Sequence, residues 1–411
     1  MALLYDYLII GGGIAGTSAA EAIRKLDSGS KIAILEDEGH LLYSRVFLPA
    51  YARGEMPLEK VMLRRWEDYS RQKIDVYLSE TAKQVDFSRR EVFAESSKVF
   101  SYKKLLIASG GRVKPWEFSA QGGSASGGEK EFADRILRLQ TLDDARRILE
   151  LGSAGRLRRV VVLGGGFITL EFLNIFRKYG SETTLLFRDD YFWKGQVEER
   201  GGKFFEELFS RNRVRTLGRE EVSELRRVGS DVQVLTKNGL KLAADWLAVG
   251  IGLERSFELV QGVSETGAGI RVNEFLEVPG VSDVWAAGDV MEYFDAISGR
   301  FRTVGNWTHA FYTGHLAGEN MAGKRLRFSS VPSYSVKILD SVATFVGEVD
   351  EKFADRTFVR EVPLERKYAR FFLKGGRLVG AVLLNAWQSK PALTRLIESG
   401  RTLSENDLTI S

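Results

Sequence analysis

The glycines of a turn near the N-terminus have the spacing that lets a chain bind a pyrophosphate. Gly11, Gly13 and Gly16 follow the pattern G-x-G-x-x-G, which permits a tight turn, close approach of the backbone to phosphate and close packing of the next helix. The first amide groups of that helix face the phosphate charge. Glu36, twenty residues past the last glycine, is placed to accept hydrogen bonds from a ribose. The predicted binding residues of this turn are Gly11, Gly13, Ile14, Ala15, Gly16 and Glu36.

The residues around this turn predict the elements that position it. Residues 5–10 and 31–36 are short apolar runs with the length of buried strands, and residues 17–26 have the period of an amphipathic helix. Because glycine-rich turns occur in many loops, a merely structural turn is the alternative interpretation. A strand, a helix and a terminal acid in register favour a βαβ unit that binds a dinucleotide. Three short alternating runs over residues 75–93 are expected to form a small antiparallel meander.

The same pattern returns about 150 residues later. An apolar run at residues 159–163 leads into three glycines at 164–166, a helical segment comes next, and a second apolar run spans residues 183–188. A further apolar run at residues 284–289 still needs a sheet well beyond this second unit. The lengths therefore predict an α/β fold with two Rossmann-like dinucleotide-binding domains, one inserted in the other.

Several domains are expected, because 411 residues are too many for one core. The first dinucleotide-binding domain is predicted to comprise residues 1–112 and 253–325, and the second to comprise residues 113–252. Residues 326–411 show alternating strands before one helix, which predicts a C-terminal α+β domain. Residues 119–130, rich in glycine and serine, are predicted to form a mobile surface loop.

The composition excludes several classes of site. There is no Cys, which excludes disulfides, thiolate nucleophiles, Cys-ligated zinc and iron–sulfur clusters. Only three His are present, and 59 basic against 55 acidic residues give no electrostatic case for nucleic acid. No apolar run approaches the roughly 18 residues that a transmembrane helix needs. We therefore expect a cytoplasmic protein without a metal site, a nucleic-acid partner or a transmembrane segment.

Further motifs come after the glycine turns in the order of one known family. These are residues 107–110, 248–252, 286–289 and 307–314. With them the chain resembles, over almost its whole length, the two-dinucleotide flavoproteins among the pyridine nucleotide oxidoreductases. It is similar to the branch without redox-active cysteines that contains NAD(P)H-dependent rubredoxin, ferredoxin and nitrite reductase flavoproteins and apoptosis-inducing factor.

The resemblance implies that the first fold binds FAD and the second binds NADPH or NADH. Asp289 would hydrogen-bond the ribityl chain or pyrophosphate region of FAD, and the helix near Trp307 would direct its positive end toward the flavin pyrimidine edge. Glu171 would lie beside the nicotinamide and flavin N5, and Arg45 would lie against the flavin, so both are predicted catalytic residues. The resemblance also implies that the cofactors are bound by Ala108, Ser109, Gly110, Gly164, Gly166, Phe167, Ile168, Arg188, Lys194, Gly250, Gly252 and Gly288.

Three departures from the family pattern matter for chemistry. No Cys occurs in the segment 43–51, where thiol-dependent members carry one, so disulfide reductase activity is excluded. Several electron-transfer members carry a lysine, paired with the glutamate, where Ala50 stands here, so the partner of Glu171 is open. Thr169 replaces the third glycine of the second turn and is expected to push helix and strand slightly apart.

The residue that ends the second strand of the second fold distinguishes NADPH from NADH. An acid there accepts hydrogen bonds from the adenosine ribose, whereas a nearby arginine binds the 2′-phosphate. Phe187 stands in the position of the acid, and Arg188 and Lys194 supply positive charge. NADPH is therefore predicted. The alternative is that Asp189 and Asp190 neutralise Arg188 and leave it an ordinary surface side chain.

Together these expectations describe an FAD enzyme that takes a hydride from NAD(P)H and passes electrons directly to a small redox protein such as a rubredoxin or ferredoxin. The alternatives are an oxidase that reduces dioxygen to peroxide, and a redox-responsive interaction protein similar to apoptosis-inducing factor. The oligomeric state is open, with a homodimer as one option. For His309 we favour packing over proton donation. For Trp387 we favour packing, in the core or a dimer interface, over a place at the site.

Overall fold

The computed structural model describes residues 2–120, 128–255, 257–262, 264 and 266–410. Its helices and strands form two compact units. The first comprises Met1–Val46, Pro57–Arg112 and Leu253–Ser330, and the second comprises Phe47–Met56, Val113–Gly252 and Val331–Ser411. The segment Phe47–Met56 thus belongs to the second unit, although the sequence placed it within the first domain. The division into three domains stays a prediction.

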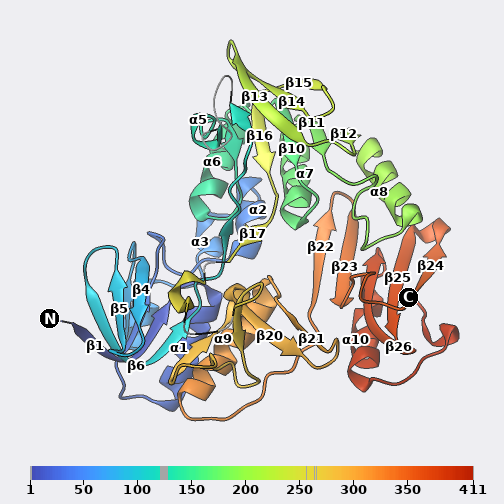
Figure 1. The fold of residues 1–411 in the computed structure, drawn as a ribbon. Coiled ribbons are helices and arrows are strands. Elements are labelled where there is room, and N and C mark those ends of the chain that lie inside the picture. The colour runs from blue at the N-terminus through green and yellow to red at the C-terminus, as the bar shows by residue number, and fades with distance from the viewer. Residues whose placement is uncertain (1, 121–127, 256, 263, 265, 411) are drawn as a thin grey trace. The chain divides into compact units, whose positions relative to one another are not determined.

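A parallel sheet forms the core of the first unit (Figure 1). Its strands, in spatial order, are β3 (Ile74–Tyr77), β2 (Ile32–Leu35), β1 (Leu3–Ile10), β6 (Val99–Ile107) and β19 (Val284–Ala286). Strands β2 and β19 are buried at every residue, as in parallel sheets that are covered on both faces. Because β19 returns to this sheet from far beyond the second fold, the predicted insertion of one fold in the other is confirmed.

The expected meander over residues 75–93 is wrong in its first strand. Strands β4 (Ala82–Asp86) and β5 (Glu91–Ala94) pair antiparallel, and β5 pairs with the first half of β6. Strand β3 instead pairs parallel with β2 at the other edge of the sheet. The connection from β2 to β3 contains α3 (Leu58–Val61) and α4 (Trp66–Arg71), so it is long enough for the crossover that parallel strands need.

Helices α1 (Ile14–Leu26) and α9 (Trp307–Met321) cross at very close range. A Cβ atom on Gly314 would come within 2.1 Å of the carbonyl oxygen of Ala15, and one on Gly318 within 2.4 Å of that of Ala19. Both distances are far below van der Waals contact, so only glycine fits there.

The remaining elements of the first unit are η1 (Arg45–Phe47), β18 (Ile270–Val272), η3 (Gly288–Val290), β20 (Met291–Asp295) and β21 (Arg300–Arg302), with the two-residue strands β7 (Arg112–Val113) and β17 (Leu253–Glu254) where the chain changes units.

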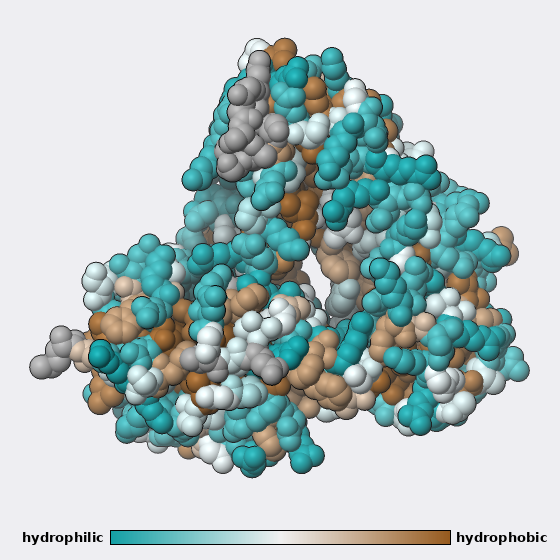
Figure 2. Space-filling model, viewed as in Figure 1, coloured by the Kyte–Doolittle hydropathy of each residue, from teal (hydrophilic) through white to brown (hydrophobic). Residues whose placement is uncertain are grey.

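The second unit repeats the architecture of the first. Its parallel sheet has the spatial order β12 (Val214–Leu217), β11 (Glu182–Leu186), β10 (Arg159–Leu163), β16 (Trp246–Val249) and β9 (Ile136–Leu137). Its helices are α6 (Leu142–Ser153), α7 (Phe167–Tyr179), α8 (Glu199–Arg211) and the short α2 (Leu48–Ala52). Helix α8 buries its glycines and most of its apolar residues and leaves a largely hydrophilic outer surface (Figure 2).

An antiparallel sheet of β13 (Val222–Val228), β14 (Asp231–Thr236) and β15 (Lys241–Ala244) extends this unit. The predicted loop at 119–130 is structured at both ends, because β8 (Ser119–Ala120) pairs with β13 and α5 (Gly128–Glu131) forms a short helix. The prediction for residues 121–127 lies outside the described residues.

The C-terminal residues form an antiparallel sheet covered by one helix, α10 (Lys390–Ser399) (Figure 1). Its spatial order is β22 (Ser333–Ile338), β23 (Ser341–Gly347), β26 (Arg377–Leu384), β25 (Lys367–Lys374) and β24 (Arg356–Val362). The amide of Asn174 on α7 donates to the carbonyl of Lys337, and its oxygen accepts from the backbone amide of Leu339. These bonds fix the β22–β23 turn to α7.

Among the described residues, every helix is too short or too polar to span a lipid bilayer.

The close helix crossing leads to a stability prediction. We expect Gly314→Ala to destabilise the first unit, because overpacking costs about 1–3 kcal/mol and alanine regains only about 1 kcal/mol of helix propensity. The measurement is thermal unfolding monitored by circular dichroism. Gly29→Ala is the control, since a Cβ atom there would meet no atom within 4 Å. Equal melting temperatures for the two variants would contradict the close crossing.

Candidate functional site

The first glycine turn connects β1 to α1 at the carboxyl edge of the sheet. Gly11 has a φ of +103°, and a Cβ atom on it would lie 2.3 Å from the carbonyl oxygen of Ala108. A Cβ atom on Gly16 would lie 1.9 Å from the carbonyl oxygen of Gly11. By contrast, a Cβ atom on Gly13 would meet nothing within 4 Å, and no side chain caps the helix that starts there. The turn is therefore closed toward the protein and open where a phosphate would meet the first amides of α1.

Glu36 comes directly after β2 and is buried at the same edge. Its Oε2 atom accepts a hydrogen bond of 2.6 Å from the amide of Gly12, and its Oε1 atom accepts one of 3.0 Å from the amide of Glu38. Burial, together with the neighbouring Asp37, raises the pKa of Glu36 to about 8. The structure thus holds a carboxyl group directly against the glycine turn, as binding of a ribose requires.

Asp289 lies in η3, just past the end of β19. Gly288, with a φ of +77°, fixes the turn because its amide donates to the Thr313 hydroxyl at 3.0 Å. Burial raises the pKa of Asp289, and the positive charges of Arg255 and Arg45 oppose that shift. Among the described residues no group hydrogen-bonds the Asp289 carboxylate. A partly buried acceptor of this kind fits the hydroxyl groups of a ribityl chain.

The N-terminus of α9 extends beyond that of α1. Ala15, the second residue of α1, meets Gly314, the eighth residue of α9. From this contact α9 extends six residues, or about 9 Å, further toward its N-terminus than α1 does. Asn306 caps α9 and accepts from the amide of His309 at 2.9 Å. Two positive helix ends at different heights suit a long ligand with a phosphate part and a second electron-rich part.

His309 packs among aromatic rings. Its ring is buried, lies 5.6 Å from the ring of Tyr293, and meets Phe328 edge-on. Burial lowers its pKa to about 4, so it is neutral at pH 7.

Arg45 has a partner that the sequence did not identify. Its Nη2 atom lies 2.5 Å from Oε1 of Glu38, and the hydroxyl of Tyr43 donates to Oε2 of the same carboxylate at 2.7 Å. The guanidinium group also lies over the Tyr43 ring. Glu38 therefore orients both residues. No sequence motif predicts this role.

The second glycine turn repeats the first with one difference. Gly164 has a φ of +124°, and a Cβ atom on it would lie 2.2 Å from the carbonyl oxygen of Gly250. Thr169, in the place of Gly16, is fully buried, and its hydroxyl donates to the same carbonyl at 3.4 Å. Since the first turn leaves no room for a Cβ atom at this position, α7 stands further from its turn than α1 does. As in α1, no side chain caps the start of α7.

Glu171 on α7 has two partners, and both contact one oxygen. Asn174 donates to Oε2 at 3.3 Å, and Nη1 of Arg53 lies 3.7 Å from the same atom. Burial raises the pKa of Glu171, whereas the Asn174 hydrogen bond and the Arg53 charge lower it. The open question of the missing lysine is thus answered, because Arg53, three residues past Ala50, supplies the cation. Oε1 of Glu171 has no protein partner among the described residues.

The strand end that is predicted to select the coenzyme carries exposed charge. Phe187 turns inward, is buried, and meets Phe192 edge-on at 5.8 Å, so it cannot bind a ribose. Arg188 is exposed and makes no hydrogen bond or ion pair with the described residues. Asp190 binds Lys194 instead, at 2.6 Å. Arg188 therefore forms no ion pair with Asp189 or Asp190, and its role as an NADPH selector or as an ordinary surface side chain stays a prediction.

Trp193 joins this loop to the second glycine turn. Its backbone adopts a φ of +60°, and its indole nitrogen donates to the carbonyl of Gly165 at 2.8 Å. The ring is buried among aromatic rings, including those of Phe167 and Phe345. The ring of Phe167 is thus a packing group, so only its backbone is left for a phosphate. No sequence motif predicts this hydrogen bond.

Other predicted binding residues lie where the strands end, and their ligand contacts stay predictions. In the first unit the Ala108 amide donates to the Ile10 carbonyl, and the buried hydroxyl of Ser109 has no partner among the described residues. In the second unit the Gly250 amide donates to Leu163. The rest of this set is Ile14, Ala15, Gly110, Gly166, Ile168, Gly252 and Trp307.

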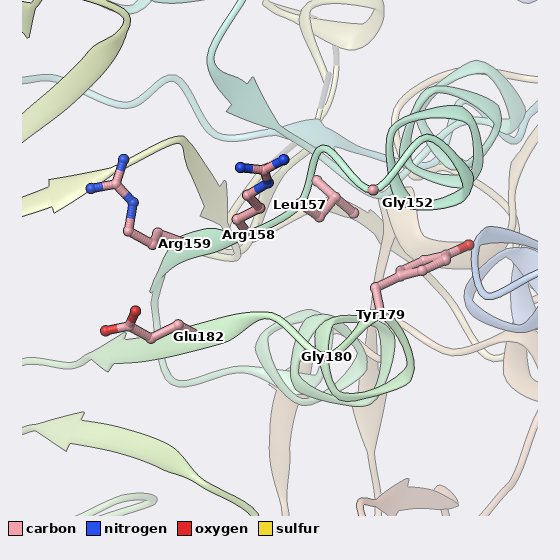
Figure 3. A pocket seen from close by; sticks show the side chains of 8 residues that line it. Gly152, Leu157, Arg158, Arg159, Tyr179, Gly180 and Glu182 are labelled. Atoms are coloured by element: carbon pink, nitrogen blue, oxygen red, sulfur yellow. The ribbon is translucent and has the colours of Figure 1, made fainter.

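A hollow of about 360 Å³ in the second unit lies elsewhere (Figure 3). It sits at the amino ends of β10 and β11, whereas ligands of such sheets bind at the carboxyl ends. Of its lining residues, Arg159 is paired with Asp231 and Asp245, and Tyr179 donates to the Ala52 carbonyl. This hollow is not a coenzyme site.

Trp387 is 53% exposed, so its predicted place in the core is wrong, and a dimer interface stays a prediction.

Known proteins share both the sequence pattern and the fold. Residues 5–314 match the pyridine nucleotide-disulphide oxidoreductases, and residues 332–401 match the rubredoxin NAD+ reductase C-terminal domain. Human apoptosis-inducing factor 3 is 26% identical over 98% of this chain, and the chain spans 64% of that protein's length. The ferredoxin–NAD(+) reductase component of the biphenyl dioxygenase system of Paraburkholderia xenovorans is 25% identical, over 97% of this chain and 95% of its own.

Solved structures carry the same fold. The covalent putidaredoxin reductase–putidaredoxin complex contains a chain that superposes with a TM-score of 0.88 at 23% identity, covering 98% of this chain and 95% of that one. The predicted resemblance and fold class are confirmed. The chain therefore belongs to the pyridine nucleotide-disulphide oxidoreductase family of FAD-dependent NAD(P)H oxidoreductases.

Proposed function

We propose that this protein is an FAD-dependent NAD(P)H oxidoreductase that passes electrons to a small electron-carrier protein. The observation that carries the proposal is the pair of glycine turns, each closed toward the protein and open at the start of an uncapped helix. Bound FAD would supply the redox chemistry, because a flavin accepts a hydride from a nicotinamide and gives up electrons singly or in pairs.

The residues of the first unit would hold FAD at its two ends. Glu36 would accept the adenosine ribose hydroxyls, the amides after Gly13 would bind the pyrophosphate, and Asp289 would bind the ribityl chain. The N-terminus of α9 would face the flavin pyrimidine edge and stabilise negative charge there.

In the second unit, Glu171 would hold the nicotinamide. Its Oε2 atom is engaged by Arg53 and Asn174, which leaves Oε1 to accept a hydrogen bond from the coenzyme. A carboxylate fixed through one oxygen can orient a ligand through the other without losing its own position. Glu171 is therefore the residue that would set the approach of the nicotinamide.

A carrier protein is the acceptor best supported by the relatives. The C-terminal residues match a rubredoxin reductase domain, one relative is named a ferredoxin reductase component, and one similar solved structure is a complex with putidaredoxin. Because the chain has no Cys, electrons must leave the flavin without a thiol relay. A second candidate is a redox-responsive interaction protein, favoured by the likeness to apoptosis-inducing factor 3 over nearly the whole chain.

NADPH is the proposed coenzyme. Phe187 is turned into the core, so no acid ends β11 to bind the ribose of NADH. Arg188 beside it is exposed and offers a charge to a 2′-phosphate. The name of the Paraburkholderia relative, which specifies NAD(+), argues against NADPH.

The function is tested with the purified protein under anaerobic conditions. One FAD per chain should be released on denaturation, and NADPH should bleach the bound flavin fully, with no thiolate charge-transfer band and no effect of alkylating agents. A rubredoxin or ferredoxin should then reoxidise the flavin at least tenfold faster than dioxygen. Faster reoxidation by dioxygen would indicate an oxidase, and a long-lived charge-transfer complex inert to every acceptor would indicate the interaction protein.

Arg188→Ala tests the choice of coenzyme. A charge-assisted hydrogen bond contributes about 1.5–3 kcal/mol, so the KM for NADPH should rise about ten- to a hundredfold while that for NADH changes little. Arg158→Ala is the control, because Arg158 is an equally exposed arginine at the opposite edge of the same sheet. A wild-type preference for NADH, or an equal loss of both coenzymes, would overturn the assignment of Arg188.

Arg53→Met tests the partner of Glu171. Because the Arg53 charge lowers the pKa of Glu171, its removal should raise that pKa, and Glu171 should stay protonated to higher pH. The measurement is carboxyl NMR with labelled glutamate, assigned with Glu171→Gln. Lys178→Met is the control, since that ammonium group faces Glu55 instead. An unchanged Glu171 titration in Arg53→Met would show that the ion pair has no electrostatic effect.

A further inference from the structure

The loop after β11 holds a carboxylate between two cations. Oδ2 of Asp190 lies 2.6 Å from Nζ of Lys194, and Oδ1 lies 2.6 Å from Nε of Arg219. These two cations lower the pKa of Asp190, so it is charged at pH 7. The cations thus form an anion site, which a side chain of the protein itself fills.

Backbone contacts hold this anion site against the end of β11, where the coenzyme is proposed to bind. The amide of Arg219 donates to the Asp189 carbonyl, and the amide of Glu220 donates to the Phe187 carbonyl, each at 3.0 Å. A Cβ atom on Gly218 would lie only 2.9 Å from the Asp189 carbonyl oxygen, so the ends of β11 and β12 are in close contact. The Trp193 hydrogen bond to the second glycine turn holds the other end of the loop.

We propose that Arg219 and Lys194, with Arg188, bind the 2′-phosphate of NADPH, and that Asp190 fills this place until the phosphate displaces it. The inference rests on the proposed binding of a nicotinamide coenzyme by the second unit. Arg219 comes from the end of a different strand, β12, and no sequence motif points to it. Asp190 is then a built-in competitor of the phosphate.

The charges favour the exchange. A phosphate monoester carries about −1.5 to −2 at pH 7 and offers three acceptor oxygens, whereas the carboxylate carries −1 and offers two. Lys194, Asp190 and Arg219 are 47%, 41% and 76% exposed, and such exposed ion pairs break at little cost. A ligand with only a 2′-hydroxyl has no charge with which to displace Asp190. Asp190 therefore reduces the preference of the site for phosphorylated coenzyme without abolishing it.

The test is calorimetric titration of the FAD-loaded protein with adenosine 2′,5′-bisphosphate and with 5′-AMP, at fixed low salt. Asp190→Asn should tighten binding of the bisphosphate about three- to tenfold and leave 5′-AMP within twofold. Asp189→Asn is the matched control, because it removes the same charge from the same loop but not the bridging carboxylate. Arg219→Ala should weaken the bisphosphate about three- to tenfold. Arg213→Ala is its control, since Arg213 precedes β12 at the other edge of the sheet with nearly the same backbone φ, +59° against +58°.

Each outcome separates this inference from the choice of NADPH. Equal effects of Asp190→Asn and Asp189→Asn would show a general field effect and overturn the role of Asp190. Equal effects of Arg219→Ala and Arg213→Ala would remove Arg219 from the site. The wild-type protein could bind both nucleotides equally while Asp190→Asn creates a preference for the bisphosphate. That result would support Asp190 as a competitor of the phosphate and would overturn NADPH as the coenzyme.

Discussion

The constraint on which the structure depends is the approach of backbone to backbone around the first glycine turn. Gly11, Gly16 and Gly314 each bring a carbonyl oxygen within about 2.3 Å of where a Cβ atom would stand. Any other residue would separate the turn, α1 and α9. Because these contacts are made by main chain, they fix the positions of both helix N-termini relative to the sheet. The proposed FAD site between Glu36 and Asp289 depends on these positions.

In the second unit this constraint is relaxed, and other interactions take its place. Thr169 replaces the close contact by a buried hydroxyl that donates to the Gly250 carbonyl. Trp193, in the loop after β11, joins that loop to the turn through a hydrogen bond to the carbonyl of Gly165. The two glycine turns thus follow the same pattern, but the main-chain contact made by Gly16 in the first is replaced by a side-chain hydrogen bond from Thr169 in the second.

The periodic parts of this architecture could be predicted from sequence, and the tertiary partners could not. Buried runs and glycine spacing identify both βαβ units and the late strand β19, because these signals are local. Strand β3 was misplaced, since alternation does not reveal which neighbour a strand pairs with. Arg53 was missed although it lies one helical turn past Ala50, because its segment packs in the second unit rather than in the first domain. Arg219 and Glu38 act through contacts between separate loops, which leave no mark in the sequence.

The proposed FAD site in the first unit and the proposed coenzyme site in the second also differ in how far their charged groups are buried. This difference matches the ligands proposed for them. In the first, Glu36 and Asp289 are carboxyl groups whose burial raises the pKa of each, so the fold carries a desolvation cost that a permanently bound partner offsets. In the second, Asp190, Lys194 and Arg219 are exposed, and their ion pairs form and break easily. Buried polar groups suit a cofactor that stays for the life of the protein. Exposed and exchangeable charges near the adenosine end suit a coenzyme that must leave after each turnover, whereas Glu171, whose pKa burial also raises, would hold the nicotinamide end.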